Sequence, residues 1–180
     1  MREPNQLFEE LKTLQAQKRL PPVKEWHPDR TGTIDIRIAA DGTWYHEGTA
    51  FARPALVRLF STILRRDEDG YFLVTPHERL KIIVEDAPFV AVGLEANGQG
   101  EDQELGLRTN TDDVVFAGAE HRLWVEEGRD GPRPYVHVRD GLNALLSRPV
   151  YYQLVALGEV QDGHLWVTSN GARFDLGSTT

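Results

Sequence analysis

The stretch RPALVRLFSTILRRDEDGYFLVT, residues 53–75, decides the fold, because its pattern returns later in the chain. At residues 148–168 the sequence reads RPVYYQLVALGEVQDGHLWVT. Both stretches open on Arg-Pro, continue with apolar residues at helical spacing, turn at Asp-Gly and end in an apolar run that finishes on Thr. Proline is favoured at the first position of a helix, where its fixed φ fits and its missing N–H is not needed. With a small gap between helix and turn, the two stretches align, and we predict an internal duplication.

Each predicted helix lies between two stretches of alternating apolar and polar residues, the pattern of half-buried strands. Before the first helix, Ile34, Ile36 and Ile38 alternate with polar residues, and Asp41-Gly42 is typical of a two-residue hairpin turn. The other predicted strands are residues 71–74, 80–84, 121–125, 135–138, 164–168 and 172–176, with turns at 69–70, 129–131 and 162–163. The repeated unit is therefore predicted to be hairpin-helix-hairpin.

The remaining segments are assigned from period and composition. Leu7, Phe8, Leu11 and Leu14 recur at spacings of three and four, which predicts an amphipathic helix over residues 5–18. Residues 85–120 show no helical period and are expected to form strands with polar turns. We predict an N-terminal helix and linker over 1–24, a first repeat domain over 25–84 and a second domain over 85–180. The fold class is α+β, mostly antiparallel strands with two main helices.

Composition excludes several classes of function. The 180 residues are 40% hydrophobic and include no cysteine, so disulfide frameworks, thiolate zinc sites and thiol nucleophiles are excluded. The net charge of −8 disfavours duplex nucleic acid and anionic membrane surfaces as partners. Met1-Arg2-Glu3-Pro4-Asn5 lacks the order of a secretory signal, and we expect a cytoplasmic protein. A small anionic ligand stays possible, since a pocket needs only a few local cations.

The sequence resembles the bacterial domain-of-unknown-function family DUF1285. The resemblance is carried by the stretch from Arg53-Pro54 through Tyr71-Phe72-Leu73-Val74-Thr75-Pro76, by Val84-Glu85-Asp86-Ala87-Pro88-Phe89 and by Arg148-Pro149-Val150-Tyr151-Tyr152. It covers nearly the whole chain from about Trp26 to Leu176. The resemblance implies a duplicated core, a C-terminal half like a pleckstrin-homology barrel, a domain-interface pocket for a nucleotide-like ligand and a role in signal transduction. It implies no enzymatic residues.

Two arginines are the main candidates for ligand binding. Arg53 and Arg148 both precede proline and are expected at or near a helix N-cap. A helix N-terminus already carries partial positive charge, so a cation there is unfavourable unless an anion lies nearby. That anion could be a ligand, or it could be Glu47 and Asp140, each a few residues upstream of its arginine.

Two further residues join the list of ligand-binding candidates. Arg139 follows a predicted strand and has no helix C-terminus to complement, unlike Arg65 and Arg66, which are expected to end the first helix. Trp44 precedes the Arg53 helix and could stack on a base, although burial in the core is the default for tryptophan.

Catalytic and metal signatures are weak. Three of the six histidines are adjacent to a glutamate, at 46–47, 77–78 and 120–121, but none reaches the His-Glu-x-x-His spacing, so no metal site, cofactor or catalytic residue is predicted. Asp112 and Asp113, with His121, are the best candidates for a metal-assisted hydrolase, although a solvated turn is the usual meaning of such a pair.

Three functions follow in order of preference. The first is a non-enzymatic ligand-sensing or signalling module that binds a small anionic ligand, such as a nucleotide-like molecule, between its two halves. The second is a protein-interaction adaptor that uses an exposed sheet edge or helix, with an unknown protein partner. The third is the hydrolase.

Overall fold

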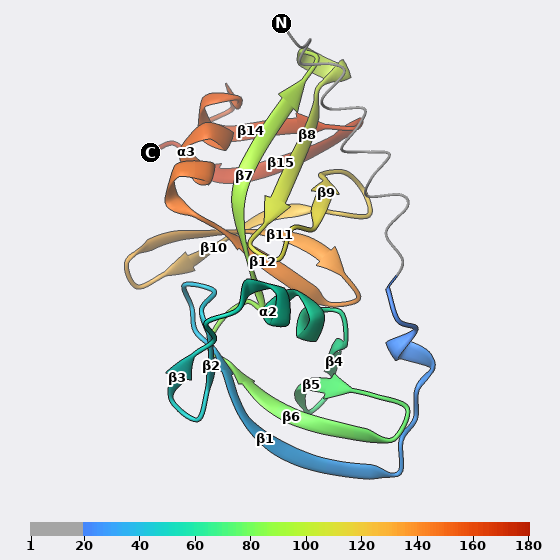
Figure 1. The fold of residues 1–180 in the computed structure, drawn as a ribbon. Helices are drawn as coiled ribbons and strands as arrows, with labels where there is room; N and C mark the ends of the chain where they lie inside the picture. The colour runs from blue at the N-terminus through green and yellow to red at the C-terminus, as the bar shows by residue number, and fades with distance from the viewer. Residues whose placement is uncertain (1–19) are drawn as a thin grey trace, which may run out of the picture.

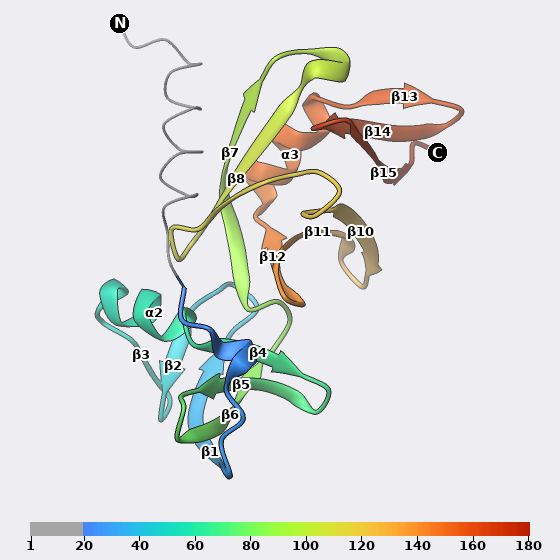
Figure 2. The ribbon, with the colours of Figure 1, turned by 90° about the vertical axis from the view of Figure 1, so that its right-hand side faces the viewer.

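The computed structural model describes residues 20–180, which form two domains stacked end to end (Figure 1). The amphipathic helix predicted over residues 5–18 lies outside the described residues. The first domain holds strands β1 to β6 and helix α2, and strand β7 carries the chain from it into the second domain (Figure 2). Within the described residues no helix is both long and apolar enough to cross a membrane.

The first domain is a six-stranded sheet in the order β3-β2-β1-β6-β5-β4. Neighbouring strands are antiparallel except β1 and β6, which pair in parallel. Helix α2 lies between this sheet and the second domain (Figure 1). The elements are the short 3-10 helix η1 (Val23–Glu25), β1 (Arg30–Ile38), β2 (Trp44–His46), β3 (Thr49–Ala50), α2 (Pro54–Ser61), β4 (Leu64–Asp67), β5 (Gly70–Val74) and β6 (Glu78–Val84).

The second domain combines a six-stranded sheet, β10-β11-β12-β7-β8-β9, with a three-stranded sheet, β13-β14-β15. Helix α3 packs on β7 and β14, so it lies inside this domain. The elements are β7 (Phe89–Asn97), η2 (Gly100–Asp102), β8 (Glu104–Thr109), β9 (Val114–Phe116), β10 (Leu123–Gly128), β11 (Gly131–Arg139), β12 (Leu142–Leu146), α3 (Arg148–Ala156), β13 (Glu159–Gln161), β14 (His164–Ser169) and β15 (Ala172–Ser178). The α+β class and the duplicated architecture predicted from the sequence are confirmed.

The duplicated unit differs from the predicted one in the hairpin before the second helix. The predicted pairing of 121–125 with 135–138 exists as β10 and β11. The strand that leads directly into α3, however, is β12, which was not predicted, and it pairs with β11 across the turn Asp140-Gly141. Leu142, Ala144 and Leu146 of β12 face the core. The counterpart of the β1–Asp41-Gly42–β2 hairpin is therefore β11–Asp140-Gly141–β12.

The first helix is shorter than predicted. It ends at Ser61, and Arg65 and Arg66 lie on strand β4 instead of on its last turn. The hydroxyls of Ser61 and Thr62 donate to the carbonyls of Arg58 and Leu59, and such local bonds compete with continuation of the helix. Leu64 then enters the core as the partner of Leu73.

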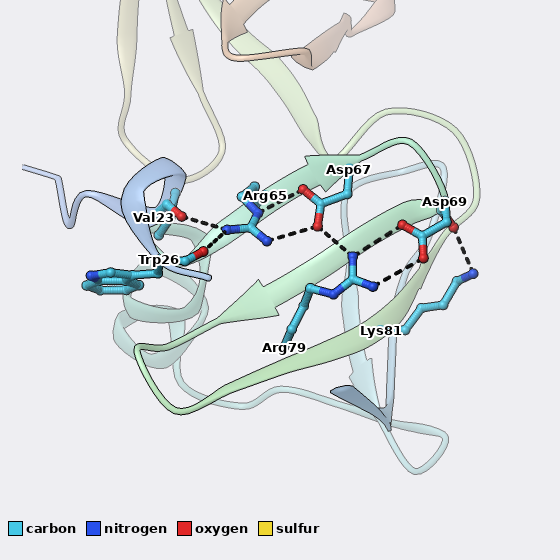
Figure 3. Close-up of polar contacts among 7 residues, drawn as sticks. All are labelled: Val23, Trp26, Arg65, Asp67, Asp69, Arg79 and Lys81. Atoms are coloured by element: carbon cyan, nitrogen blue, oxygen red, sulfur yellow. Dashed lines mark hydrogen bonds and ion pairs between the residues drawn. The ribbon is translucent and has the colours of Figure 1, made fainter. Parts of the chain in front are cut away.

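Arg65 instead joins a polar network that fastens the start of the described chain to the first sheet (Figure 3). Its guanidinium donates to the backbone carbonyls of Val23 and Trp26, at 2.7 and 2.8 Å, and to the carboxylate of Asp67. Asp67 also accepts from Arg79 at 2.7 Å. Burial raises the pKa of Asp67, but hydrogen bonds from Arg65 and Arg79 outweigh it and lower the pKa overall. The network holds residues 23–26 against the first sheet.

Two turns, one from each domain, contact the opposite domain directly. The carbonyl of Gly42, in the β1–β2 turn, accepts from the side-chain amide of Asn110 at 3.3 Å. The same amide accepts from the backbone N–H of Val90 at 3.0 Å, so one side chain joins both domains. On the other side, Arg66 reaches the carbonyl of Gly141 at 3.5 Å.

Two glycines at equivalent turns of the duplicated unit differ in how much space a side chain would have. Gly42 and Gly141 both have positive φ, +89° and +78°. A Cβ on Gly42 would lie 2.8 Å from Asn110 Nδ2 and from Val90 Cγ2, whereas the nearest atom to a Cβ on Gly141 would be 3.6 Å away.

We therefore expect Gly42→Ala to destabilise the protein more than Gly141→Ala. Left-handed strain alone should cost the Gly141 variant about 1–2 kcal/mol. The Gly42 variant should lose a further ~1–3 kcal/mol, because the clash displaces Asn110 and Val90. Urea unfolding of the two variants measures the difference. Equal losses would contradict this, because they would show that Asn110 and Val90 can move aside without a cost in stability.

Candidate functional site

A pocket of about 840 Å³ lies where the two domains meet. The first domain contributes Ala40 and Asp41 from the β1–β2 turn. The second domain contributes the β10–β11 hairpin, the end of β12 and the start of α3. Its charged lining residues are three arginines and two aspartates, namely Arg129, Arg133, Arg148, Asp41 and Asp130.

Arg148 is the first residue of α3 and lines this pocket. The preceding residue, Ser147, is the N-cap with extended backbone, and its N–H is bonded to the carbonyl of Ala91 on β7. The Ser147 side chain makes no capping hydrogen bond. Arg148 forms no ion pair with any residue of 20–180. Arg148 and the positive end of the helix thus border the same pocket, and no carboxylate of residues 20–180 pairs with this arginine.

The other two arginines come from the β10–β11 hairpin. Arg129 occupies the exposed tip and, like Arg148, has no ion-pair partner among residues 20–180. Arg133 is engaged: its Nε donates to the hydroxyl of Tyr135 at 3.0 Å, and its Nη2 donates to Asp86. The Tyr135 hydroxyl donates to the other oxygen of Asp86 at 2.8 Å. These bonds, first that to Tyr135 and then that to Asp86, raise the pKa of Arg133.

The wall from the first domain is fixed by the linker between the domains. Glu85 accepts from the backbone N–H of Ala40 at 2.9 Å and from Arg37 at 2.6 Å. The Asp41 carboxylate caps its own turn by accepting from the Thr43 backbone N–H, which lowers the pKa of Asp41. Asp41 therefore stays ionised at neutral pH and contributes a negative charge beside the arginines.

An aromatic pair from α3 completes the pocket. The rings of Tyr151 and Tyr152 lie 6.4 Å apart at 34°, and Tyr152 is 62% exposed. Burial, and secondarily the charge of Glu127, raise the pKa of Tyr151, which keeps its hydroxyl as a donor at neutral pH. The pocket thus offers guanidinium groups at one part of its wall and aromatic surface at another.

The structure does not bring the four predicted ligand-binding residues together. Arg148 lines the interface pocket, while Arg53 is the exposed N-cap of α2 and does not line that pocket. Trp44 is 2% exposed in the core, edge-on to Phe51, and its indole N–H has no protein acceptor in the described chain. Arg139 donates to Asp113 at 3.1 Å and to the carbonyl of Ser61 at 2.9 Å.

The internal anions proposed as alternatives lie elsewhere. Asp140 pairs with Lys24 instead of Arg148. Glu47, at the exposed β2–β3 turn, forms no ion pair with Arg53 within residues 20–180. Internal pairing therefore does not account for either arginine.

The three residues considered for hydrolysis are engaged in structural contacts. The side chain of Asp113 is 2% exposed and paired with Arg139. Asp112 is at an exposed turn near Arg58 and Arg108, at 3.6 and 3.9 Å. His121 bonds the carbonyl of His137 at 3.0 Å. These contacts favour a structural role for each.

Sequence reasoning missed Arg129 and Arg133. Arg129 falls in a predicted turn and Arg133 just after it. Local spacing does not predict that this hairpin shares a pocket with the start of α3. The available signal was the alternation of Arg133 with Tyr135, which puts both side chains on one face of β11.

The comparisons with known proteins agree on one family. The model of the DUF1285 N-terminal domain, a domain of unknown function, matches residues 21–87, and that of the DUF1285 C-terminal domain matches residues 88–176. A crystal structure of a DUF1285 family protein from Silicibacter pomeroyi DSS-3 is 45% identical with a TM-score of 0.86, over 94% of this chain and 95% of that one.

A second crystal structure, of a DUF1285 family protein from Shewanella baltica OS155, is 30% identical with a TM-score of 0.54, over 67% of this chain and 90% of that one. No curated protein matches the chain. The two family models together span most of the chain, and the protein belongs to the DUF1285 family.

Proposed function

We propose that this protein is a non-enzymatic, ligand-sensing module that binds a small anionic, nucleotide-like ligand in the interface pocket. The observation that carries the proposal is the convergence of Arg129, Arg133 and Arg148 on a pocket of about 840 Å³ built by both domains. Pockets of this size suit small ligands and occur preferentially at domain interfaces.

Two of these arginines, Arg129 and Arg148, support the proposal because neither forms an ion pair within the described residues. Arginine forks bind phosphate and carboxylate groups through paired, charge-assisted hydrogen bonds. An anion placed between Arg129 and Arg148 would also lie near the N–H groups that open α3. The tyrosines offer the face on which a planar ring can stack.

Ligand binding in this pocket would be coupled to the relative placement of the two domains. Ala40 and Asp41 belong to the first domain, and the arginines to the second. A ligand that contacts both walls stabilises the arrangement in which they face each other. Sensing would then consist of holding the two domains in this arrangement.

Arg148→Ala is expected to weaken ligand binding, whereas Arg53→Ala leaves it unchanged. The two arginines occupy equivalent positions in the duplicated sequence, but only Arg148 lines the pocket. Loss of one charge-assisted contact is worth about 1.5–3 kcal/mol, or roughly 10- to 100-fold in Kd. Thermal-shift titration with adenosine monophosphate and inorganic phosphate measures the effect. For the wild type, ligand at a hundredfold excess over Kd should add about 2.7 kcal/mol of stability.

A result in which neither probe stabilises the wild type would contradict the proposal. So would equal losses in the Arg53 and Arg148 variants, because the pocket would then not distinguish the two helix starts. Arg129→Ala gives a second pocket variant on a different element, and it should behave like Arg148→Ala.

The adaptor function stays as a second candidate because of strand β13. Its three residues are exposed at the edge of the three-stranded sheet, and Val160 is 66% exposed. An exposed edge can accept a strand from a partner. If Val160→Lys abolished binding of a partner while Arg148→Ala left it intact, this function would be favoured over ligand sensing.

A further inference from the structure

One arginine of the interface pocket, Arg133, is already paired with a carboxylate of the protein, that of Asp86. Asp86 lies in the linker between β6 and β7 and is not one of the residues that line the pocket. It accepts one bond from Arg133 and one from the Tyr135 hydroxyl, and its side chain is 20% exposed. Asp86 is thus paired with Arg133, and Arg133 lines the pocket.

Charge limits what the pocket can accept. Three arginines and two aspartates line it, which leaves one net positive charge. When Asp86 on Arg133 is included, the surroundings are neutral. A phosphomonoester carries a charge of about −1.5 to −2 at pH 7 and can be held by the two unpaired arginines, Arg129 and Arg148. A polyphosphate carries more charge than these two groups offset and would also be repelled by Asp41 and Asp130, which line the pocket.

The rest of the lining favours a ring over a second charge. Tyr151, Tyr152 and the apolar side chains of Val90, Pro132 and Leu145 line the same pocket. Such a surface binds a flat apolar or aromatic group by burial and stacking. It adds no positive charge that could hold a further anion.

We propose that the pocket is specific for a planar ring carrying a single anionic group, and that Asp86 sets this limit by occupying Arg133. The inference rests on the proposed function and adds the charge class of the ligand to it. Asp86 is a specificity-determining residue that acts through Arg133.

The chain offers a matched pair of variants. Asp86→Asn and Asp35→Asn each remove one negative charge by the same substitution. Asp86 contacts the pocket residue Arg133, whereas Asp35 is exposed on β1, does not line the pocket and forms no ion pair within residues 20–180. An effect of overall charge would appear in both variants, and an effect through Arg133 only in the first.

The experiment is calorimetric titration of the wild type and both variants with adenosine monophosphate, adenosine triphosphate and adenosine, at fixed ionic strength and without divalent cations. We expect the wild type to bind the monophosphate at least tenfold tighter than the triphosphate and than adenosine. Asp86→Asn should tighten the triphosphate by roughly tenfold, as expected when a guanidinium is released for a charge-assisted bond. Asp35→Asn should change it less than about twofold.

The outcomes separate this inference from the function on which it rests. Triphosphate binding as tight as monophosphate binding in the wild type, or equal effects of the two variants, would overturn the inference and leave the anion pocket standing. Absence of binding by every probe, in proteins whose thermal unfolding shows them to be folded, would overturn both.

Discussion

Arg139→Met is expected to cost about 3–5 kcal/mol of unfolding free energy, the usual loss when one partner of a buried ion pair is removed. The Arg139 guanidinium pairs with Asp113, whose side chain is 2% exposed, and donates to the carbonyl of Ser61 at the end of α2. Methionine fills much of the same space but leaves Asp113 without this charge and Ser61 without this donor. Because Ser61 and Asp113 belong to different domains, the contact between the domains should loosen as well. Urea unfolding measures the loss.

The control is a second arginine-aspartate pair across the same interface. Arg58 on α2 lies 3.6 Å from Asp112, the residue next to Asp113, and both side chains are about half exposed, 44% and 59%. Exposed pairs contribute about 0–1 kcal/mol, so Arg58→Met should change stability by no more than that. Adding Asp113→Asn to Arg139→Met should recover part of the loss, because a neutral amide is less costly to bury without a neighbouring cation than a carboxylate. Equal losses from Arg58→Met and Arg139→Met would contradict this account.

Arg139 also shows why a residue's role is harder to predict than the element that carries it. The sequence predicts the strand through Val138 and leaves Arg139 without a local partner. Its actual partners, Ser61 and Asp113, lie 78 and 26 residues away in the chain. Periodicity reports which side of an element is buried, but it contains no information on which distant element comes to that side.

The elements themselves could be predicted where local physics decides them. Arg-Pro marks the start of both helices, and Pro54 and Pro149 each stand in the first turn. Strand β12 was missed because its apolar residues run directly into the Arg148 helix, with no turn between them to mark a boundary. The end of α2 was missed for the opposite reason: Ile63 and Leu64 continue the apolar spacing of the helix, although the backbone has already left it.

The pocket could be predicted only in part, because it depends on how the two repeats diverged. The duplication suggested that Arg53 and Arg148 would act as a symmetric pair. In the structure, the start of α3 opens onto the other domain, and the start of α2 does not line the pocket. Asymmetry of this kind comes from the linker and from the β10–β11 hairpin, which has no counterpart in the first repeat. A repeat therefore predicts equivalent folds without predicting equivalent sites.

The same asymmetry should appear in the stability contributed by the two helices. Leu154 of α3 is fully buried, while Leu59 of α2 is 61% exposed. Leu154→Ala should cost about 2–5 kcal/mol, because it removes buried apolar surface and leaves a cavity between α3 and the strands β7 and β14. Leu59→Ala removes the same atoms from solvent and should change stability by only about 0.5 kcal/mol.

Chemical denaturation of the two leucine variants measures this difference directly, since the substitution is identical and both positions lie within an α-helix. A large difference would mean that α3 is part of the core of its own domain, which makes it a rigid base for Arg148 and the tyrosines of the pocket. Helix α2, with its more exposed apolar residues, would then contribute to the contact between the domains more than to a core. Comparable losses would mean that α2 is held as firmly as α3, and the first domain would have to be regarded as equally rigid at the interface.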